Sequence, residues 1–163
     1  MIKRISVLGL LLGSLVLTSA TSNRSEDVVG YRCLIQLTNY GGEGAYVITS
    51  LLNPEGTYEQ TLYVGGDDAE WYPDLPTWYE YYDASGEDID GITGASIQSG
   101  SRKVTLLEVP ADKLNQGYKL RFESSVEDGM YHDRDIEVDL SDDMVGKTIE
   151  GSGYIRYVRL ITK

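Results

Sequence analysis

Short segments in which apolar and polar residues alternate, separated by turn residues, constrain the fold of this chain most strongly. Between residues 118 and 126, for example, Tyr118, Leu120 and Phe122 alternate with charged side chains. Because side chains of a strand point in turn to opposite faces, a period of two predicts β-strands. The predicted strands are residues 31–38, 45–52, 58–64, 103–109, 118–126, 133–140 and 154–162.

Seven short strands at this spacing predict an all-β fold, an antiparallel β-sandwich of the immunoglobulin type. The first three strands are expected to pair as a meander. The length of 163 residues is that of one ordinary domain, and no internal repeat suggests a second one.

The segment at residues 65–100 interrupts this pattern. It lacks sustained alternation and contains the aromatic run WYPDLPTWYEYY at residues 71–82. A long irregular insert in a compact domain is usually either functional or disordered, and its many aromatic residues argue against disorder. Pro76 is expected to open a short helix that reaches Tyr82.

The N-terminus has the order of a secretory signal. Lys3 and Arg4 precede an apolar run at residues 5–17, and the small residues 18–20 follow. The run is shorter than the about 20 residues that span a bilayer, so cleavage near Ala20 is favoured over an uncleaved anchor. The predicted organisation is a signal peptide at 1–20, a polar leader at 21–29 and one β-sandwich domain at 30–163 of a periplasmic or otherwise exported protein.

The charge balance excludes two classes of partner. Asp plus Glu number 26 against 14 Lys plus Arg, a formal net charge of -12. Nucleic-acid binding needs a basic patch, and none is present. Polybasic attachment to anionic lipids is excluded for the same reason, so the protein is expected to be peripheral to a membrane at most.

Candidates for catalysis or metal binding are few. Cys33 is the only cysteine, so no intrachain disulfide can form, and it is expected to be a small buried residue. With His132 as the only histidine and no G-x-S-x-G segment, neither a zinc site nor a catalytic residue is predicted. The acidic run at residues 83–91 lacks the spacing of an EF-hand, and an irregular calcium site in the acidic loops stays open.

One short segment carries a specific signal. Residues 90–96 read DGITGAS and resemble the motif D-x-x-[ST]-G-A-[ST] for covalent flavinylation. In proteins with this motif, a flavin transferase of the ApbE type moves FMN from FAD onto the last hydroxyl residue. The resemblance implies that Ser96 accepts FMN through a phosphoester, with serine in place of the usual threonine.

The other motif positions have chemistry that suits this role. The resemblance implies that the transferase reads Asp90, Thr93, Gly94 and Ala95, and the last two are small enough to enter a cleft. Gly94 can also adopt a turn conformation that presents the hydroxyl. The alternative is a plain turn in which Thr93 and Ser96 hydrogen-bond their own backbone.

A tethered isoalloxazine ring needs flat partners, and the aromatic insert supplies candidates. Trp71, Trp78 and Tyr79 are predicted to flank the ring. The alternative is that these side chains pack the loop over an edge of the sandwich.

The order of features resembles an exported bacterial family, domain of unknown function 2271. Its pattern is a W-x-x-x-L-x-x-W-like segment, here 71–78, an acidic T-G-A-[ST] turn, here 90–96, and E-x-G-x-Y, here 127–131. The resemblance covers about residues 31–163. It implies electron transfer outside the cytosol, with a flavin transferase and a PepSY-type membrane redox protein as partners.

Two functions follow from these observations. The first is a periplasmic electron-transfer protein with FMN linked to Ser96, which is itself a substrate of an enzyme and not an enzyme. The second is an exported immunoglobulin-like interaction module that binds a protein or glycan through the aromatic loop 71–82.

Overall fold

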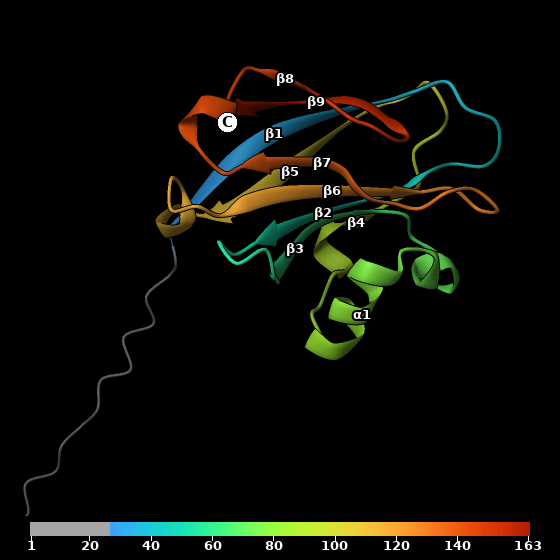
Figure 1. Cartoon of the computed structure of the whole chain (residues 1–163), viewed down its shortest axis with the longest axis horizontal. Coiled ribbons are helices and arrows are strands. Elements are labelled where there is room, and N and C mark those ends of the chain that lie inside the picture. The colour runs from blue at the N-terminus through green and yellow to red at the C-terminus, as the bar shows by residue number, and fades with distance from the viewer. Residues whose placement is uncertain (1–26) are drawn as a thin grey trace, which may run out of the picture.

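Two β-sheets packed face to face form the body of the molecule (Figure 1). The computed structural model describes residues 27–163, so the predicted signal peptide at 1–20 lies outside the described residues. The first strand already begins at Val28, so the end of the predicted leader belongs to the domain. No helix in residues 27–163 is long and apolar enough to cross a membrane.

One sheet has four strands and the other has five. In spatial order, the first contains β5 (Arg102–Pro110), β1 (Val28–Leu37), β9 (Ile155–Thr162) and β8 (Thr148–Glu150). The second contains β4 (Thr93–Gly94), β3 (Tyr58–Gly65), β2 (Tyr46–Leu52), β6 (Lys119–Ser125) and β7 (His132–Asp139). Short 3-10 helices η3 (Ala111–Lys113) and η4 (Asp142–Met144) lie in the connections.

The predicted all-β sandwich is confirmed, and each of the seven predicted segments contains a strand. Strands β4 and β8 are additional, and both are too short to show alternation. The predicted meander is wrong, because β1 pairs with β5 and β9 whereas β2 pairs with β3 and β6. In an immunoglobulin domain the first two strands share a sheet, so the likeness is one of architecture and not of strand connectivity.

The main core fills the space between the two sheets. From β1, Tyr31, Cys33, Ile35 and Leu37 point into it and are at most 1% exposed. Cys33 is thus the small buried residue that the sequence predicts. Burial raises the pKa of its thiol to about 12, so the reactive thiolate is absent at neutral pH.

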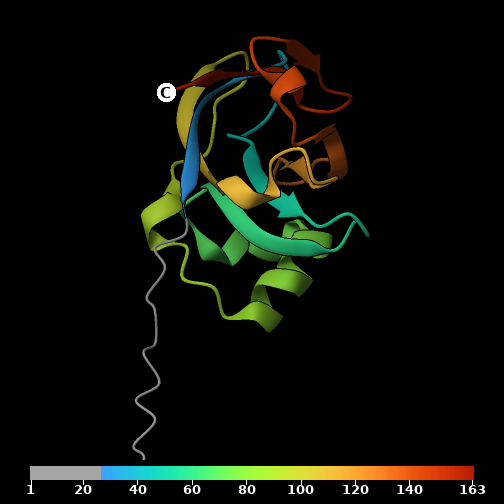
Figure 2. The same cartoon turned by 90° about the vertical axis from the view of Figure 1, so that its left-hand side faces the viewer.

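The aromatic insert forms a third layer on the outer face of the five-stranded sheet (Figures 1 and 2). It contains η1 (Ala69–Asp74), α1 (Pro76–Ser85) and η2 (Asp90–Ile92), and it also supplies β4, the edge strand of that sheet. The predicted helix is confirmed and extends to Ser85. Pro76 opens it at the first turn, and Gly86 ends it in the left-handed conformation at φ 65°.

A second apolar cluster joins this layer to the sheet. Tyr72, Leu75 and Trp78 of the insert pack against Ile48 and Val64, which point outward from β2 and β3. Because the insert covers this face, it is buried although polar side chains occupy part of it. This part of the five-stranded sheet is therefore covered on both faces.

Candidate functional site

The flavinylation-like motif runs along the edge of the five-stranded sheet. Asp90 begins η2, and Thr93 and Gly94 form β4, which pairs in parallel with β3. The Gly94 carbonyl also accepts a hydrogen bond from the Gly66 amide at 2.6 Å. The sheet thus positions the segment just before Ser96.

The two hydroxyls of the motif have different environments. Thr93 Oγ1 donates to the Ile89 carbonyl at 2.8 Å and so holds the turn together. Ser96 is half-buried, and its hydroxyl makes no hydrogen bond with any residue in the described range 27–163. The plain-turn alternative therefore holds for Thr93 and not for Ser96.

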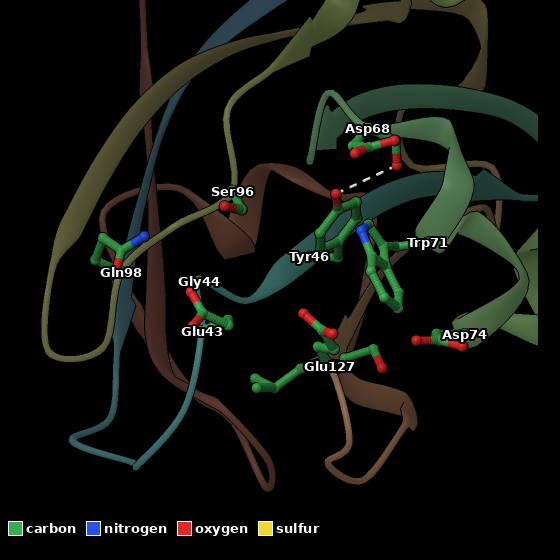
Figure 3. A pocket seen from close by; sticks show the side chains of 11 residues that line it. Glu43, Gly44, Tyr46, Asp68, Trp71, Asp74, Ser96, Gln98 and Glu127 are labelled. Carbon is green, nitrogen blue, oxygen red and sulfur yellow. Dashed lines mark hydrogen bonds between the residues drawn. The ribbon is translucent and has the colours of Figure 1, made fainter.

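Ser96 faces a cavity of about 190 Å³ (Figure 3). Trp71 from η1 and Tyr46 from β2 supply its aromatic wall, and Gln98 and Glu127 lie on other sides. These residues come from four separate segments of the chain. The cavity therefore exists only in the folded protein.

A glycine next to Ser96 keeps room for its side chain. A Cβ added to Gly44 would lie 2.5 Å from Ser96 Oγ and 2.8 Å from Gln98 Nε2, closer than such atoms approach. Gly66 has a similar function, because an added Cβ would lie 2.1 Å from the ring of Tyr46. Tyr46 is oriented further by donation from its hydroxyl to the Asp68 carbonyl at 3.2 Å.

We expect Gly44→Ala to lower the free energy of unfolding by about 1–3 kcal/mol, because the methyl group must displace Ser96 or Gln98. Urea unfolding measures this loss. The control is Gly41→Ala in the same loop, where an added Cβ meets no atom within 4 Å. Equal stability of the two variants would contradict the close packing at Ser96.

The cavity is acidic. Glu43, Asp68, Asp74 and Glu127 line it, and its lining contains no basic side chain. An anion that relied on charge for binding would be repelled from such a site. In the described part of the chain, no group of His, Cys, Asp or Glu side chains is arranged to hold a metal ion.

The three aromatic side chains predicted to flank the ring, those of Trp71, Trp78 and Tyr79, lie in different environments. Trp71 is half-buried and lines the cavity with Ser96. Trp78 is 0% exposed, stacks on Tyr82 at 5.0 Å and donates from its indole N–H to Thr61 Oγ1 at 3.1 Å. The prediction that Trp78 flanks a ring is therefore wrong, since its indole belongs to the core.

Tyr79 is also separate from the cavity. Its ring packs on the second apolar cluster, 6.5 Å from the ring of Tyr82. Tyr81 and Tyr82 also pack partly against this cluster, and Tyr72 is only 5% exposed. The loop is therefore chiefly a packed layer on the sheet.

Tyr46 and Glu127 also line the cavity, and neither is among the site residues predicted from the sequence. Tyr46 occupies an ordinary strand position, and no local signal marks it. Glu127 does have a signal, because it opens the E-x-G-x-Y segment. The fold places that segment beside Trp71 and Ser96, the other two features of the family pattern.

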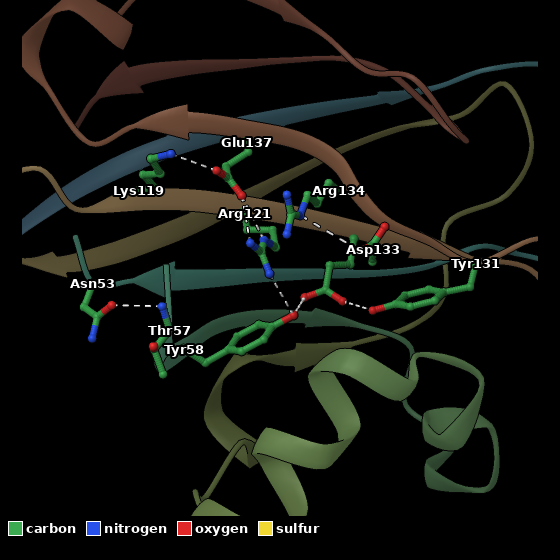
Figure 4. Close-up of polar contacts among 10 residues, drawn as sticks. Asn53, Thr57, Tyr58, Lys119, Arg121, Tyr131, Asp133, Arg134 and Glu137 are labelled. Carbon is green, nitrogen blue, oxygen red and sulfur yellow. Dashed lines mark hydrogen bonds and ion pairs between the residues drawn. The ribbon is translucent and has the colours of Figure 1, made fainter. Parts of the chain in front are cut away.

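A cluster of polar side chains lies on the outer face of the five-stranded sheet, the face that the insert covers (Figure 4). Glu123 of β6 is 0% exposed and accepts hydrogen bonds from two phenols, at Oε1 from Tyr58 at 2.5 Å and at Oε2 from Tyr131. Arg121 binds Glu137 instead, through Nη2 at 2.8 Å and Nε at 3.1 Å. Burial raises the pKa of Glu123 to about 7, although both phenols and the Arg121 charge oppose the rise.

This buried acid makes stability depend on pH. Between pH 4.5 and about 7 Glu123 is ionised in the unfolded chain and protonated in the folded one, so unfolding releases a proton. Raising the pH through this window therefore costs about 3 kcal/mol of stability, fully lost above pH 7. We expect the loss from pH 5 to pH 8 to shrink by about that amount in Glu123→Gln. Urea unfolding at both pH values measures it.

The matched control for this prediction is Glu108→Gln, at an exposed position of β5. It should leave the difference in stability between pH 5 and pH 8 unchanged. If Glu123→Gln shows the same pH dependence as the unmodified chain, Glu123 ionises normally in the folded state.

The fold and site define a class, a β-sandwich with a packed aromatic insert and an acidic cavity at the insert's edge. A family model described as predicted periplasmic protein (DUF2271) matches residues 29–157. The chain belongs to this family. The family's description supports an exported location, while cleavage after Ala20 stays a prediction. No curated protein and no solved structure matches the chain.

Proposed function

We propose that this protein is an exported electron carrier with FMN bound covalently through a phosphoester to Ser96. The observation that carries the proposal is the position of the Ser96 hydroxyl. It is the motif hydroxyl without an internal hydrogen bond in residues 27–163, and it opens onto a cavity with an aromatic wall. Flavin supplies the redox chemistry, and the protein retains and tunes it.

The attachment reaction needs only an accessible alcohol on this chain. A bond forms between Ser96 Oγ and the FMN phosphorus of FAD, and the bond from that phosphorus to AMP breaks. The hydroxyl proton passes to a base of the transferase, which is of the ApbE type. Asp90, Gly91 and Ala95 are exposed and are available for recognition by that enzyme.

The cavity is too small to enclose FMN, and its size suits a cofactor that is held by a covalent tether. Its volume of about 190 Å³ is below the range of roughly 300–1,000 Å³ for ligand pockets. Part of the FMN would occupy the cavity, and the rest would lie at the surface near Trp71. Stacking on an indole is a favourable arrangement for a flat ring.

The charge of the cavity supports a covalent rather than a dissociable cofactor. A free FMN phosphate would meet Glu43, Asp68, Asp74 and Glu127 with no cation among the lining residues. Only a covalent bond would retain the group there. The same carboxylates disfavour addition of an electron, so we expect a lower midpoint potential than that of free FMN.

Its redox partners would be extracytosolic. The family resemblance favours a PepSY-type membrane redox protein as donor or acceptor. The alternative, an interaction module that uses loop 71–82, has no comparable support, because most of that loop's aromatic side chains pack inward.

Intact mass tests the proposal. The chain is co-expressed with an ApbE-type transferase in the export compartment, and the purified protein should gain one FMN less one water. Peptide mapping should place the gain on the peptide that contains Ser96, and the yellow colour should survive denaturation. An unmodified mass, with the transferase active on a control substrate, would overturn the proposal.

A further inference from the structure

We propose that Glu123 takes up the proton that accompanies electron transfer to the group on Ser96, with Tyr131 as its hydrogen-bonded connection to the cavity. The inference rests on the proposed function and assigns a second site to it. Glu123 would be a positioning and charge-compensating residue, because it does not contact the redox group.

The negative charge of Glu123 is not balanced by a paired cation, so protonation is the way to neutralise it. The carboxylate is fully buried and each oxygen accepts a bond from a neutral phenol. Arg121 donates to Glu137 and, at 3.4 Å, to the Tyr58 hydroxyl, and within residues 27–163 Glu123 itself has no ion pair. An isolated buried carboxylate is costly, so a small change in local potential shifts its protonation.

Tyr131 connects this acid to the space near Ser96. Besides donating to Glu123, it lines a cavity of about 220 Å³ together with Asp74, Ser125 and Val126. The same three residues also line the cavity in front of Ser96. The two cavities therefore adjoin, and the Tyr131 phenol lies between the buried acid and accessible space.

The separation of the two sites suits electrostatic coupling without contact. Gly44 adjoins Ser96, and Ile48 pairs with Glu123 across β2 and β6. Because Gly44 and Ile48 are four residues apart, their Cα atoms are separated by at most roughly 14 Å. At an effective dielectric constant of 20, a unit charge at that distance shifts a pKa by about 0.9 pH unit.

The proton step balances with one electron. A one-electron reductant that carries no proton, such as the methyl viologen radical cation, would be oxidised to its dication as the redox group on Ser96 gains the electron. The Tyr131 O–H bond breaks as a new O–H bond forms at Glu123 Oε2, and a hydronium ion in the cavity restores the Tyr131 hydroxyl. The net change is one electron added at Ser96 and one proton taken from solvent at Glu123.

Other titratable groups around Glu123 come from every packed element. They are Tyr58 of β3, Tyr81 and the adjoining Glu87 beside α1, Arg121 of β6, Tyr131, and Asp133 and Glu137 of β7. Burial raises the pKa of the three phenols, so they stay neutral near pH 7. Glu137 is held by Lys119 and Arg121, and its pKa is lowered. Glu123 differs from these groups, because it is a carboxyl whose burial raises its pKa to about 7.

The test measures the Glu123 carboxyl directly in flavin-loaded protein. Mass spectrometry first verifies FMN on Ser96. Carbon NMR of glutamate-labelled protein then gives the Glu123 pKa in oxidised and dithionite-reduced samples. We expect a rise of about 0.5 to 1 pH unit on reduction, and an identical pKa in both states would overturn the inference.

The role of the Tyr131 phenol is tested separately, through the rate of proton uptake. The protein is mixed in a stopped-flow instrument with reduced methyl viologen, whose oxidation releases no proton, and a pH indicator follows proton uptake. Tyr131→Phe should slow this uptake at least tenfold while the flavin content stays unchanged. Tyr58→Phe is the matched control, since it removes the other phenol of Glu123 but not the one that lines the cavity. Equal slowing by both variants would exclude Tyr131 as the connection.

Failure of the proposed function is distinguishable from failure of this inference. If no FMN is found on Ser96, Ser96→Cys can be labelled with an anionic or a neutral thiol reagent, because Cys33 is fully buried. The anionic label should raise the Glu123 pKa relative to the neutral one by a similar amount. No difference between the labels would overturn the coupling itself.

Discussion

Ser96→Ala is expected to abolish covalent FMN incorporation, measured as the fraction of intact protein that carries the added mass. Alanine lacks the oxygen that forms the phosphoester. The neighbouring Thr93 hydroxyl cannot replace it, since it donates to the Ile89 carbonyl and holds the turn. The fold should be unchanged, because Ser96 Oγ makes no hydrogen bond with the described part of the protein.

Two variants control this experiment. Ser96→Thr restores the commoner residue of the motif and should be modified. Ser101→Ala removes a hydroxyl from an exposed position on the same stretch of chain and should incorporate FMN as the unmodified chain does. A mass gain that persists in Ser96→Ala would place the attachment elsewhere and remove the basis of the proposed function.

Trp78→Ala should give the second large effect, a loss of about 3–5 kcal/mol in the free energy of unfolding. The indole is fully buried between α1 and the sheet, and its N–H donates to Thr61. Its removal leaves a cavity and an unpaired hydroxyl beneath the insert. Urea unfolding at one pH measures the loss.

Trp71→Ala is the matched control because it removes the same side chain from the same insert. Trp71 is half-buried at the cavity, so the expected loss of stability is about 1 kcal/mol. In flavin-loaded protein this variant should instead raise flavin fluorescence, since a stacked indole quenches it. Reversed effects of the two variants would mean that Trp78, not Trp71, faces the ligand site.

The position of the cavity bears on the proposed attachment of FMN. The two-sheet core is complete without the cavity, which is formed where the insert meets the ends of β2 and β6. Such a site can be loaded after folding, because it lies at the surface. Under the proposed function, the protein supplies one accessible hydroxyl and an acidic environment for the flavin.

Much of the fold was predictable because its signals are local. Alternation in segments such as 118–126 depends only on the strand's own period, and Pro76 and Gly86 mark the ends of α1 by their backbone preferences. The candidate hydroxyl of Ser96 could likewise be predicted from the sequence, because an enzyme that recognises a short segment requires a local motif.

Pairing between strands was not predictable in this way. β1 lies in one sheet and β2 in the other, although the connection between them is short. Which edges meet depends on how the two apolar faces close over a common core, and that choice involves contacts far apart in the sequence.

The amino-acid sequence by itself therefore determined seven of the nine strands in residues 27–163, the helix and the candidate hydroxyl at Ser96. Only the tertiary structure decided that Trp71 lines the cavity whereas Trp78 is buried, and that Glu123, on the charged side of an alternating strand, has no contact with water. The physical reason is that burial depends on what covers a face. Here the cover is the insert at residues 65–100, whose packing against β2 and β3 no local pattern encodes.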